Sequence, residues 1–332
     1  MKFTRAAITS VGKFLPQRIL TNKDLEGILD TSDEWIVQRT GIRSRHFLDP
    51  GLGNSYMASR AALACLNRAG VSPLEVDTII IGTISADTAF PSTACAVQNI
   101  IGADNAWGYD LSAGCSGFLY ALTTGAQFIE SGRYKKVLIV GSDVNSMYLT
   151  PEDRSTYVLF GDGAGAVLLE PSEDSDLGII DFANQVDGVG GPYLVVKAGG
   201  SKRPATLETV KNKEHFVYQD GRMVFKYAVK NMADMAVSMM ERNNIKSDDL
   251  DLFIPHQANI RIIEACAKRM QIDLEKVIIN IEKYANTTCG TIPLCFCDAV
   301  EEGRLKKGDK LIIASFGAGF TWGSTYIRWA MD

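Results

Sequence analysis

The sequence lacks any long hydrophobic run, which argues against a helical membrane span. Although 46% of its 332 residues are hydrophobic, no stretch approaches the roughly 18 consecutive apolar residues of such a helix. The segment 1–8 loses its apolar character too early for a secretory signal peptide. We therefore expect a globular protein of the cytoplasm.

The sequence also lacks a disulfide framework and an excess of positive charge. Its seven cysteines are odd in number and lie in apolar surroundings, without the spacing of a small disulfide-bonded domain. The net charge of -5 argues against extensive nucleic-acid binding, although a local basic patch is compatible with it. These features again favour a reducing compartment.

A phosphate-binding glycine loop is missing as well. The run 161–165 contains three glycines, but it lacks the Gly-x-Gly-x-x-Gly spacing ahead of a helix. It leads instead into the apolar segment 166–169, which predicts a strand. We interpret these glycines as residues that allow close packing.

The apolar segments that are present alternate with segments of helical period. This alternation, with glycines at the boundaries, predicts an α/β fold whose strands are covered on both faces. The predicted strands are 6–11, 76–82, 136–141, 252–254, 277–279 and 310–313, and the predicted helices include 33–40, 54–68 and 118–129.

Three stretches repeat at one ungapped offset of 174 residues. Asp77 pairs with Asp251, Lys136 with Lys310, and Cys115 with Cys289. We infer two related α/β halves, 1–173 and 174–332, with a seam near 171–178. The loops at equivalent strand ends are then expected to meet at a pseudo-twofold interface and to share one site.

Cys115 lies where an apolar run meets the helical pattern 118–129. At a helix N-terminus, unpaired backbone N–H groups and the helix dipole both favour the thiolate. Cys115 is therefore a candidate nucleophile. A small buried thiol that fills a tight strand-to-helix junction explains these residues equally well.

Two residues of the second half could assist this nucleophile. His256 follows the predicted strand 252–254, where an imidazole can be held in one tautomer, although a capping or buried histidine is an ordinary alternative. Asn286 lies in a turn-rich run, where asparagine is common for reasons of backbone geometry. Together, a thiol and two donors suit covalent catalysis on a thioester, with an acyl group stored on sulfur and an enolate or oxyanion stabilised.

Six segments, in order across nearly the whole chain, resemble β-ketoacyl-[acyl-carrier-protein] synthase III. They are 31–41, 110–120, 160–166, 255–259, 286–287 and 317–324. The resemblance implies a thiolase-like fold in a five-layer αβαβα arrangement, with two pseudo-twofold related α/β halves of five strands each, and a homodimer.

The resemblance also implies a reaction, the decarboxylative condensation that starts type II fatty-acid synthesis. Cys115 would take the acyl group from an acyl-CoA, and malonyl-acyl carrier protein would then lose CO2. Its enolate would attack the acyl carbon to give 3-ketoacyl-acyl carrier protein, while His256 and Asn286 donate hydrogen bonds to the malonyl thioester oxygen. Backbone N–H groups of Cys115 and Ala318 would form the oxyanion hole. Because glycine is frequent in the family at position 318, alanine there requires a negative φ.

Substrate-binding residues are implied by the same resemblance. Trp35 and Arg154 would sandwich the adenine of CoA, although a tryptophan that anchors a loop in the core is the alternative. Phe90 corresponds to the residue that closes the partner's acyl pocket across the dimer. The implied CoA-binding residues are Thr31, Trp35, Arg39, Arg154 and Asn259, and the expected carrier-protein surface is Lys226, Gln257, Arg261, Lys268 and Arg269.

Other interpretations stay open at this point. A solvated helix face explains the basic residues equally well, and Cys289 is expected near the site in a structural role. The same fold could serve secondary metabolism with another acceptor, and a cysteine hydrolase could use His256 as a base for water. A non-catalytic scaffold is the remaining class. We expect no cofactor, metal, nucleic acid or membrane partner; the primer, whether acetyl, branched or longer, is undetermined.

Overall fold

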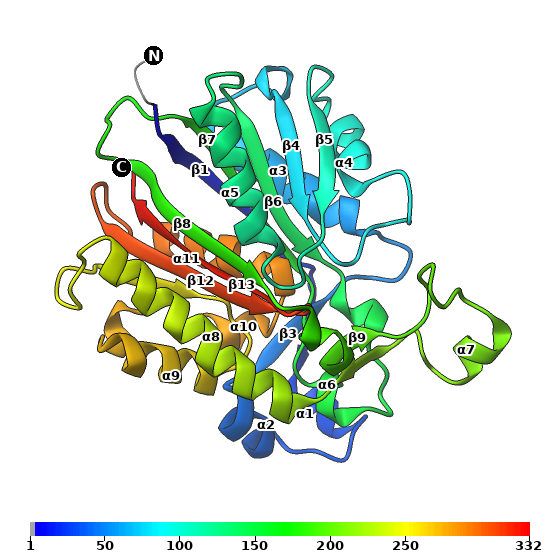
Figure 1. Cartoon of the computed structure of the whole chain (residues 1–332). Helices are drawn as coiled ribbons and strands as arrows, with labels where there is room; N and C mark the ends of the chain where they lie inside the picture. Colours follow the sequence, from blue (N-terminus) through cyan, green and yellow to red (C-terminus); the bar gives the residue numbers. More distant parts are fainter. Residues whose placement is uncertain (1–3) are drawn as a thin grey trace.

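The first half of the chain is built around a five-stranded sheet of order β1-β7-β6-β4-β5 (Figure 1). The computed structural model describes residues 4–332; positions 1–3 of the segment considered for a signal peptide lie outside them. β4 lies between β5 and β6 and is parallel to both, whereas β7 is antiparallel to β6 and β1. The strands are β1 (Ala6–Phe14), β4 (Thr78–Gly82), β5 (Trp107–Leu111), β6 (Val137–Asp143) and β7 (Gly163–Pro171).

The second half repeats this topology with one strand fewer. Its sheet has the order β11-β12-β13-β8, with β11 parallel to β12 and β13 antiparallel to both neighbours. The predicted strand 277–279 is reduced to a single bridge between Val277 and Phe253. The strands are β8 (Gly178–Val186), β11 (Leu252–Pro255), β12 (Lys310–Gly317) and β13 (Thr321–Arg328).

The missing strand has a local cause in Gln257. Its side-chain amide donates to the carbonyl of Ile278, and its Oε1 accepts from the N–H groups of Asn280 and Ile281. A glutamine side chain thus takes the backbone groups that a neighbouring strand would otherwise pair. Pro255 also has no N–H with which β11 could continue the ladder to Ile278, so the prediction of five strands in this half is wrong.

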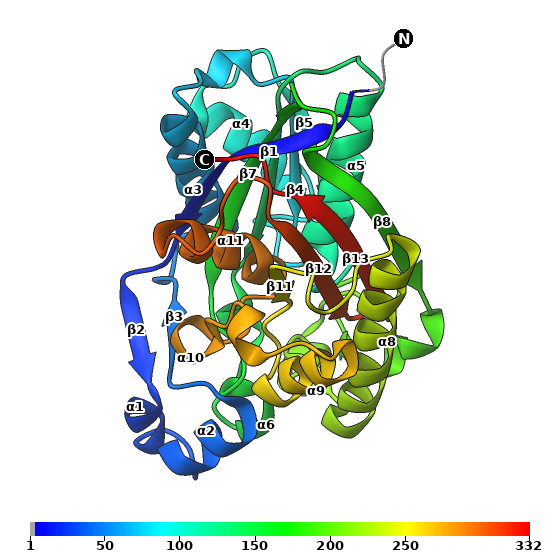
Figure 2. The ribbon, with the colours of Figure 1, turned by 90° about the vertical axis from the view of Figure 1, so that its left-hand side faces the viewer.

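Helices complete five layers, as Figures 1 and 2 show. α5 (Gly117–Glu130) and α11 (Thr291–Glu301) contribute to one buried core with strands of both sheets, so they form the central layer. α3 (Asn54–Ala69) and α4 (Thr93–Ile101) cover the outer face of the first sheet. α8 (Gly221–Arg242) and α9 (Ile260–Met270) cover the second. The predicted αβαβα arrangement is confirmed.

The internal duplication is visible in the element bounds. β4 begins at Thr78 and β11 at Leu252, while α5 begins at Gly117 and α11 at Thr291, so both pairs keep the offset of 174 residues. Cys115 and Cys289 each lie two residues before a central helix. The division into 1–173 and 174–332 stays a prediction.

Shorter helices and strands lie outside the two main sheets and the helices that cover them. α2 starts after Ser32, whose side chain accepts from the N–H of Trp35, and ends at Gly41 with φ 80, both as predicted. Figure 2 shows α1, α2, β2 and β3 together at one end of the molecule. The shorter elements are β2 (Arg18–Thr21), α1 (Asn22–Glu26), α2 (Asp33–Thr40), β3 (Ser44–Phe47), α6 (Arg154–Tyr157), β9 (Leu194–Val196), α7 (Leu207–Lys211), β10 (Val217–Gln219) and α10 (Ile281–Tyr284). Within residues 4–332, none of the helices is both long and apolar enough to cross a membrane.

Candidate active site

Cys115 lies just before α5, at a point where two loops approach very closely. A Cβ atom added to Gly317 would lie 2.4 Å from the backbone nitrogen of Cys115. One added to Gly114, which has φ 54, would lie 2.6 Å from the nitrogen of Ala318. Glycine at both positions therefore lets the loop of Ala318 approach the nucleophile loop.

The thiol of Cys115 is buried, and burial controls its protonation. Desolvation raises the pKa of Cys115 to about 12, and the Asp143 carboxylate raises it as well. Hydrogen bonds from the backbone N–H groups of Ala318 and Cys115 act in the opposite direction but are weaker. Burial and the Asp143 charge therefore oppose the stabilisation of the thiolate that is expected at a helix start.

His256 is buried directly after β11. Its Nδ1 lies 2.7 Å from Oγ1 of Thr291, whereas its Nε2 is buried without a partner. Burial lowers the pKa of His256 to about 3, so the imidazole is neutral near pH 7. A neutral imidazole with an unpaired Nε2 is available to a ligand.

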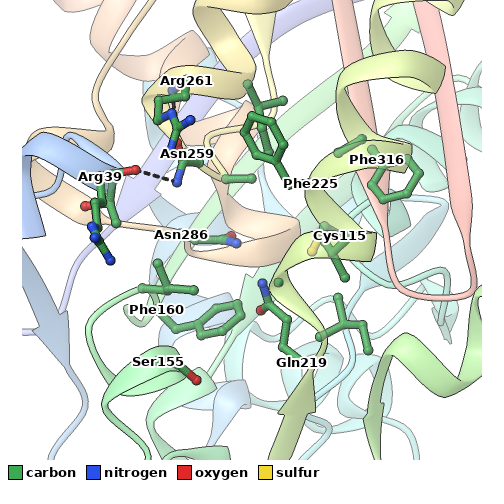
Figure 3. A pocket seen from close by; sticks show the side chains of 18 of the residues that line it. Arg39, Cys115, Ser155, Phe160, Gln219, Phe225, Asn259, Arg261, Asn286 and Phe316 are labelled. Carbon is green, nitrogen blue, oxygen red and sulfur yellow. Dashed lines mark hydrogen bonds between the residues drawn. The ribbon is translucent and has the colours of Figure 1, made fainter.

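Asn286 has one end of its amide fixed. The backbone N–H of Thr288 donates to Oδ1 of Asn286 at 2.8 Å. The backbone of Asn286 is tied to the first half, since its N–H donates to Leu159 and its carbonyl accepts from Gly161. Figure 3 shows Asn286 and Cys115 pointing into the same pocket. The Nδ2 donor is the end left for a ligand.

These three side chains line one cavity of about 650 Å³. Cys115 comes from the first half, and His256 and Asn286 come from the second. Phe316 and Phe225 supply apolar wall (Figure 3). The structure therefore brings together a thiol and two polar side chains that lie far apart in the sequence.

A second, more apolar cavity of about 240 Å³ also reaches Cys115. Most of its wall is aliphatic or aromatic, and β9 and β10 form one side of it. Its lining includes Ile84, Tyr148, Leu149, Phe160, Leu194, Val195, Val196 and Val217. An acyl group on the sulfur of Cys115 would have room on this side.

Trp35 lines the larger cavity, and two arginines lie over its ring. The guanidinium carbon of Arg154 is 4.7 Å from the ring centroid of Trp35, and that of Arg39 is 4.5 Å away. An adenine between Trp35 and Arg154 would need about 7 Å, or two contact distances. The gap between Trp35 and Arg154 is therefore too narrow for an adenine in this structure.

The two remaining residues expected to bind CoA are placed differently. Asn259 lines the cavity, caps α9 and donates to the carbonyl of Arg39 at 2.9 Å (Figure 3). Thr31 lines neither the larger cavity nor the smaller one, so its expected contact with CoA stays a prediction.

Comparisons with known proteins agree with this geometry. Residues 109–188 match the family model described as 3-oxoacyl-[acyl-carrier-protein (ACP)] synthase III, and residues 240–329 match that of its C-terminal part. The chain is 56% identical over 327 residues to the β-ketoacyl-[acyl-carrier-protein] synthase III of Koribacter versatilis (strain Ellin345), covering 98% of each. The chain belongs to the β-ketoacyl-[acyl-carrier-protein] synthase III family. The predicted family and enzyme class, an acyltransferase, are thereby confirmed.

Solved structures agree over the same length. The 3-oxoacyl-[acyl-carrier-protein] synthase III of Aquifex aeolicus VF5 is 41% identical with a TM-score of 0.89, covering 98% of this chain and 100% of that one. The priming β-ketosynthase of the R1128 polyketide pathway is 31% identical with a TM-score of 0.90, covering 98% and 96%. The predicted thiolase-like fold is confirmed.

The expected carrier-protein residues differ in exposure. Gln257 is fully buried, and its amide also donates to the carbonyl of Pro255, so its side chain has no surface to offer a partner. Lys226, Arg261, Lys268 and Arg269 are exposed, although Arg269 pairs with Asp234 at 3.2 Å. Arg261 lies over Phe225 at the cavity.

Sequence reasoning missed several residues around the site. Arg222 lines the cavity one helical turn before Lys226, a spacing that could have identified it. Thr291, Thr288 and Asp143 also support the site, but short polar residues at a helix start, in a turn or at a strand end carry no distinctive signal. In the described part of the chain, no group of three or more His, Cys, Asp or Glu side chains could hold a metal ion.

Proposed function

We propose that this chain condenses an acyl-CoA primer with malonyl-acyl carrier protein at the start of type II fatty-acid synthesis. The products are 3-ketoacyl-acyl carrier protein, CoA and CO2. The observation that carries the proposal is the convergence of Cys115, His256 and Asn286 on one cavity, in a chain whose relatives bear this enzyme's name.

In the first half-reaction, the sulfur of Cys115 attacks the thioester carbonyl of acyl-CoA. Because burial holds the pKa of Cys115 near 12, the thiol gives up its proton as it attacks, and this proton ends on the sulfur of CoA. The backbone N–H groups of Cys115 and Ala318 donate to the oxyanion. An alanine at position 318 requires a negative φ. In this loop the positive φ, 142, falls on Gly319 and not on Ala318.

In the second half-reaction, His256 and Asn286 bind the thioester oxygen of the malonyl group. Loss of CO2 moves negative charge onto this oxygen, so fixed donors stabilise the transition state more than the ground state. The Nδ2 of Asn286 donates directly. The Nε2 of His256 donates when the Thr291 hydroxyl supplies the hydrogen to Nδ1. The enolate carbon then attacks the acyl carbon, and the sulfur of Cys115 leaves and regains a proton.

Acyl-CoA approaches along the large cavity, past Trp35 and Arg39. Arg154 swings away from Trp35 so that the adenine can take its place. The acidic carrier protein docks on Lys226, Arg261, Lys268 and Arg269, with Arg222 added at the cavity. Loss of CO2 drives the carbon–carbon bond without net oxidation or reduction, so the reaction needs no cofactor.

The active unit is a homodimer in the cytoplasm. β5 is an edge strand of its sheet, and apolar side chains are exposed on or near it: Phe90 by 86%, Ile100 by 50% and Trp107 by 44%. Open strand edges and exposed apolar surface favour association. Phe90 then reaches the partner's smaller cavity.

Product analysis tests this function. The protein is mixed with acyl-CoA, with and without malonyl-acyl carrier protein. Formation of CO2 and a 3-ketoacyl product only with the malonyl carrier supports the proposal, whereas rapid release of free acid without it would indicate a hydrolase. Transfer to another acceptor would indicate secondary metabolism, and failure of Cys115 to be acylated would indicate a scaffold.

A further inference from the structure

Asp143 is a fully buried carboxylate at the end of β6 that the reaction itself does not use. Its Oδ1 accepts from the first half: from the hydroxyls of Thr83 and Ser85 and the N–H of Ile84, at 2.8 to 2.9 Å. Its Oδ2 accepts from the second half: from the hydroxyl of Thr288 and from the N–H of Cys289 at 3.1 Å. Asp143 thus joins the wall of the smaller cavity to the loop that carries Asn286.

Thr288 has an unusual backbone conformation in this loop. Its φ is 50, and a β-branched residue is disfavoured in this left-handed region. Its hydroxyl bonds to Asp143 and also lies 3.3 Å from Oδ1 of Asn145, and its N–H donates to Oδ1 of Asn286. The conformation therefore depends on these contacts and not on the intrinsic preference of threonine.

This conformation decides which end of the Asn286 amide faces the cavity. The Thr288 N–H pairs only with an oxygen, so Oδ1 is held away and Nδ2 is left for the substrate. With the amide reversed, Oδ1 would face the developing enolate and repel it.

The same loop also supports the second donor. The Thr291 hydroxyl lies 2.7 Å from Nδ1 of His256 and 3.1 Å from the carbonyl of Thr288. That carbonyl also accepts the backbone N–H of Thr291. When the hydroxyl hydrogen points to Nδ1 of His256 instead of to this carbonyl, Nε2 carries the imidazole proton and can donate. One loop, anchored at Asp143, thus contacts both catalytic side chains.

We propose that Asp143 and Thr288 are positioning residues that hold the amide of Asn286 with its N–H groups toward the substrate oxygen. The inference rests on the proposed function, because it assigns Asn286 as a donor to the enolate. A carboxylate suits this task because all five of its partners are donors. An asparagine at 143 would turn its own NH2 group toward some of them.

Variants of Thr288 test the inference with matched shapes. Thr288→Val keeps the branched shape and removes the hydroxyl, whereas Thr288→Ser keeps the hydroxyl. We expect valine to lower the condensation rate roughly tenfold or more, and to lower it more than the acylation of Cys115 by acetyl-CoA, although Thr288 also lines the smaller cavity. Serine should restore condensation. Equal loss of both half-reactions, or a valine variant as active as the parent, would overturn the proposal.

A double-mutant cycle links the effect to Asn286. In the Asn286→Ala background, Thr288→Val should cause no further loss, because the group it positions is gone. A full additional loss would assign Thr288 a different role. If the valine variant does not fold, Thr288→Ala takes its place in the same cycle. The parent's own activity separates the two claims: no 3-ketoacyl product from the parent would refute the proposed function, whereas an active parent unaffected by these substitutions would refute only the positioning role.

A second readout concerns Asp143 itself. The Asp143 charge raises the pKa of the Cys115 thiol, so Asp143→Asn should shift the pH profile of Cys115 alkylation to lower pH while condensation falls. An unchanged pH profile of Cys115 alkylation, together with an unchanged condensation rate, would contradict the positioning role of Asp143.

Discussion

Replacing His256 with alanine separates the two half-reactions. The substitution removes the Nε2 donor, while the groups that serve acyl transfer, the Cys115 thiol and the N–H of Ala318, stay in place. Loss of one preorganised donor to a developing oxyanion costs about 3 kcal/mol, or roughly 10²- to 10³-fold in rate. We expect condensation to fall by this factor and acylation of Cys115 to change little.

The same substitution also has a consequence for acid stability. The pKa of buried His256 is lowered to about 3 from an ordinary 6.5. Between these values the unfolded chain binds a proton that the folded protein excludes, so the folded state loses stability as the pH falls below about 6.5. The slope is at most about 1.4 kcal/mol per pH unit for one group. His256→Ala should therefore lose less stability than the parent between pH 6 and 4.

The assays are single-turnover acylation, condensation with malonyl-acyl carrier protein, and urea unfolding as a function of pH. His215→Ala is the matched control, because His215 lines neither cavity. A His256→Ala variant that is defective only in accepting the acyl group would refute the assigned role. An unfolding free energy with the same pH slope as the parent would refute the buried neutral imidazole.

Three further predictions follow from the site. Cys115→Ser should abolish acyl transfer while retaining decarboxylation of malonyl carrier protein; unchanged transfer, measured by intact mass, would disprove the nucleophile. In a Cys95→Ser background, which removes the exposed cysteine, iodoacetamide labelling of Cys115 should rise about tenfold per pH unit from pH 7 to 10; a plateau near pH 8 would contradict the raised pKa. Val196→Phe should narrow the cavity of about 240 Å³ and lower kcat/KM for long acyl-CoA primers more than for acetyl-CoA; an equal effect on both would place the acyl chain elsewhere.

The α/β class and the duplication were accessible from the sequence because they depend on periodicity, whereas the five-layer arrangement was implied by the resemblance to the synthase III family. The offset of 174 residues predicted equivalent junctions, and β4 with β11 and α5 with α11 begin at those positions. Cys115, His256 and Asn286 were candidates from their positions at junctions and turns, but packing or capping explained each one alone, and the resemblance to the synthase III family singled them out. Their placement on one cavity required the fold.

Other features depend on contacts that no local pattern encodes. The resemblance predicted Gln257 as a surface residue beside His256. Its buried amide instead forms hydrogen bonds with backbone groups of Ile278 and Asn280. The helix start at Cys115 was visible in the sequence, whereas the burial that raises its pKa was not. Asp143 and Thr288 come from opposite halves and acquire a role only where their loops meet.

The most direct test of the account is a two-step single turnover followed by intact-protein mass spectrometry. After incubation with acyl-CoA and removal of free CoA, the protein should carry one acyl group on Cys115. Addition of malonyl-acyl carrier protein should then discharge it, with one equivalent each of CO2 and 3-ketoacyl-acyl carrier protein. An acyl group on another residue, or discharge as free acid without the malonyl carrier, would contradict the account.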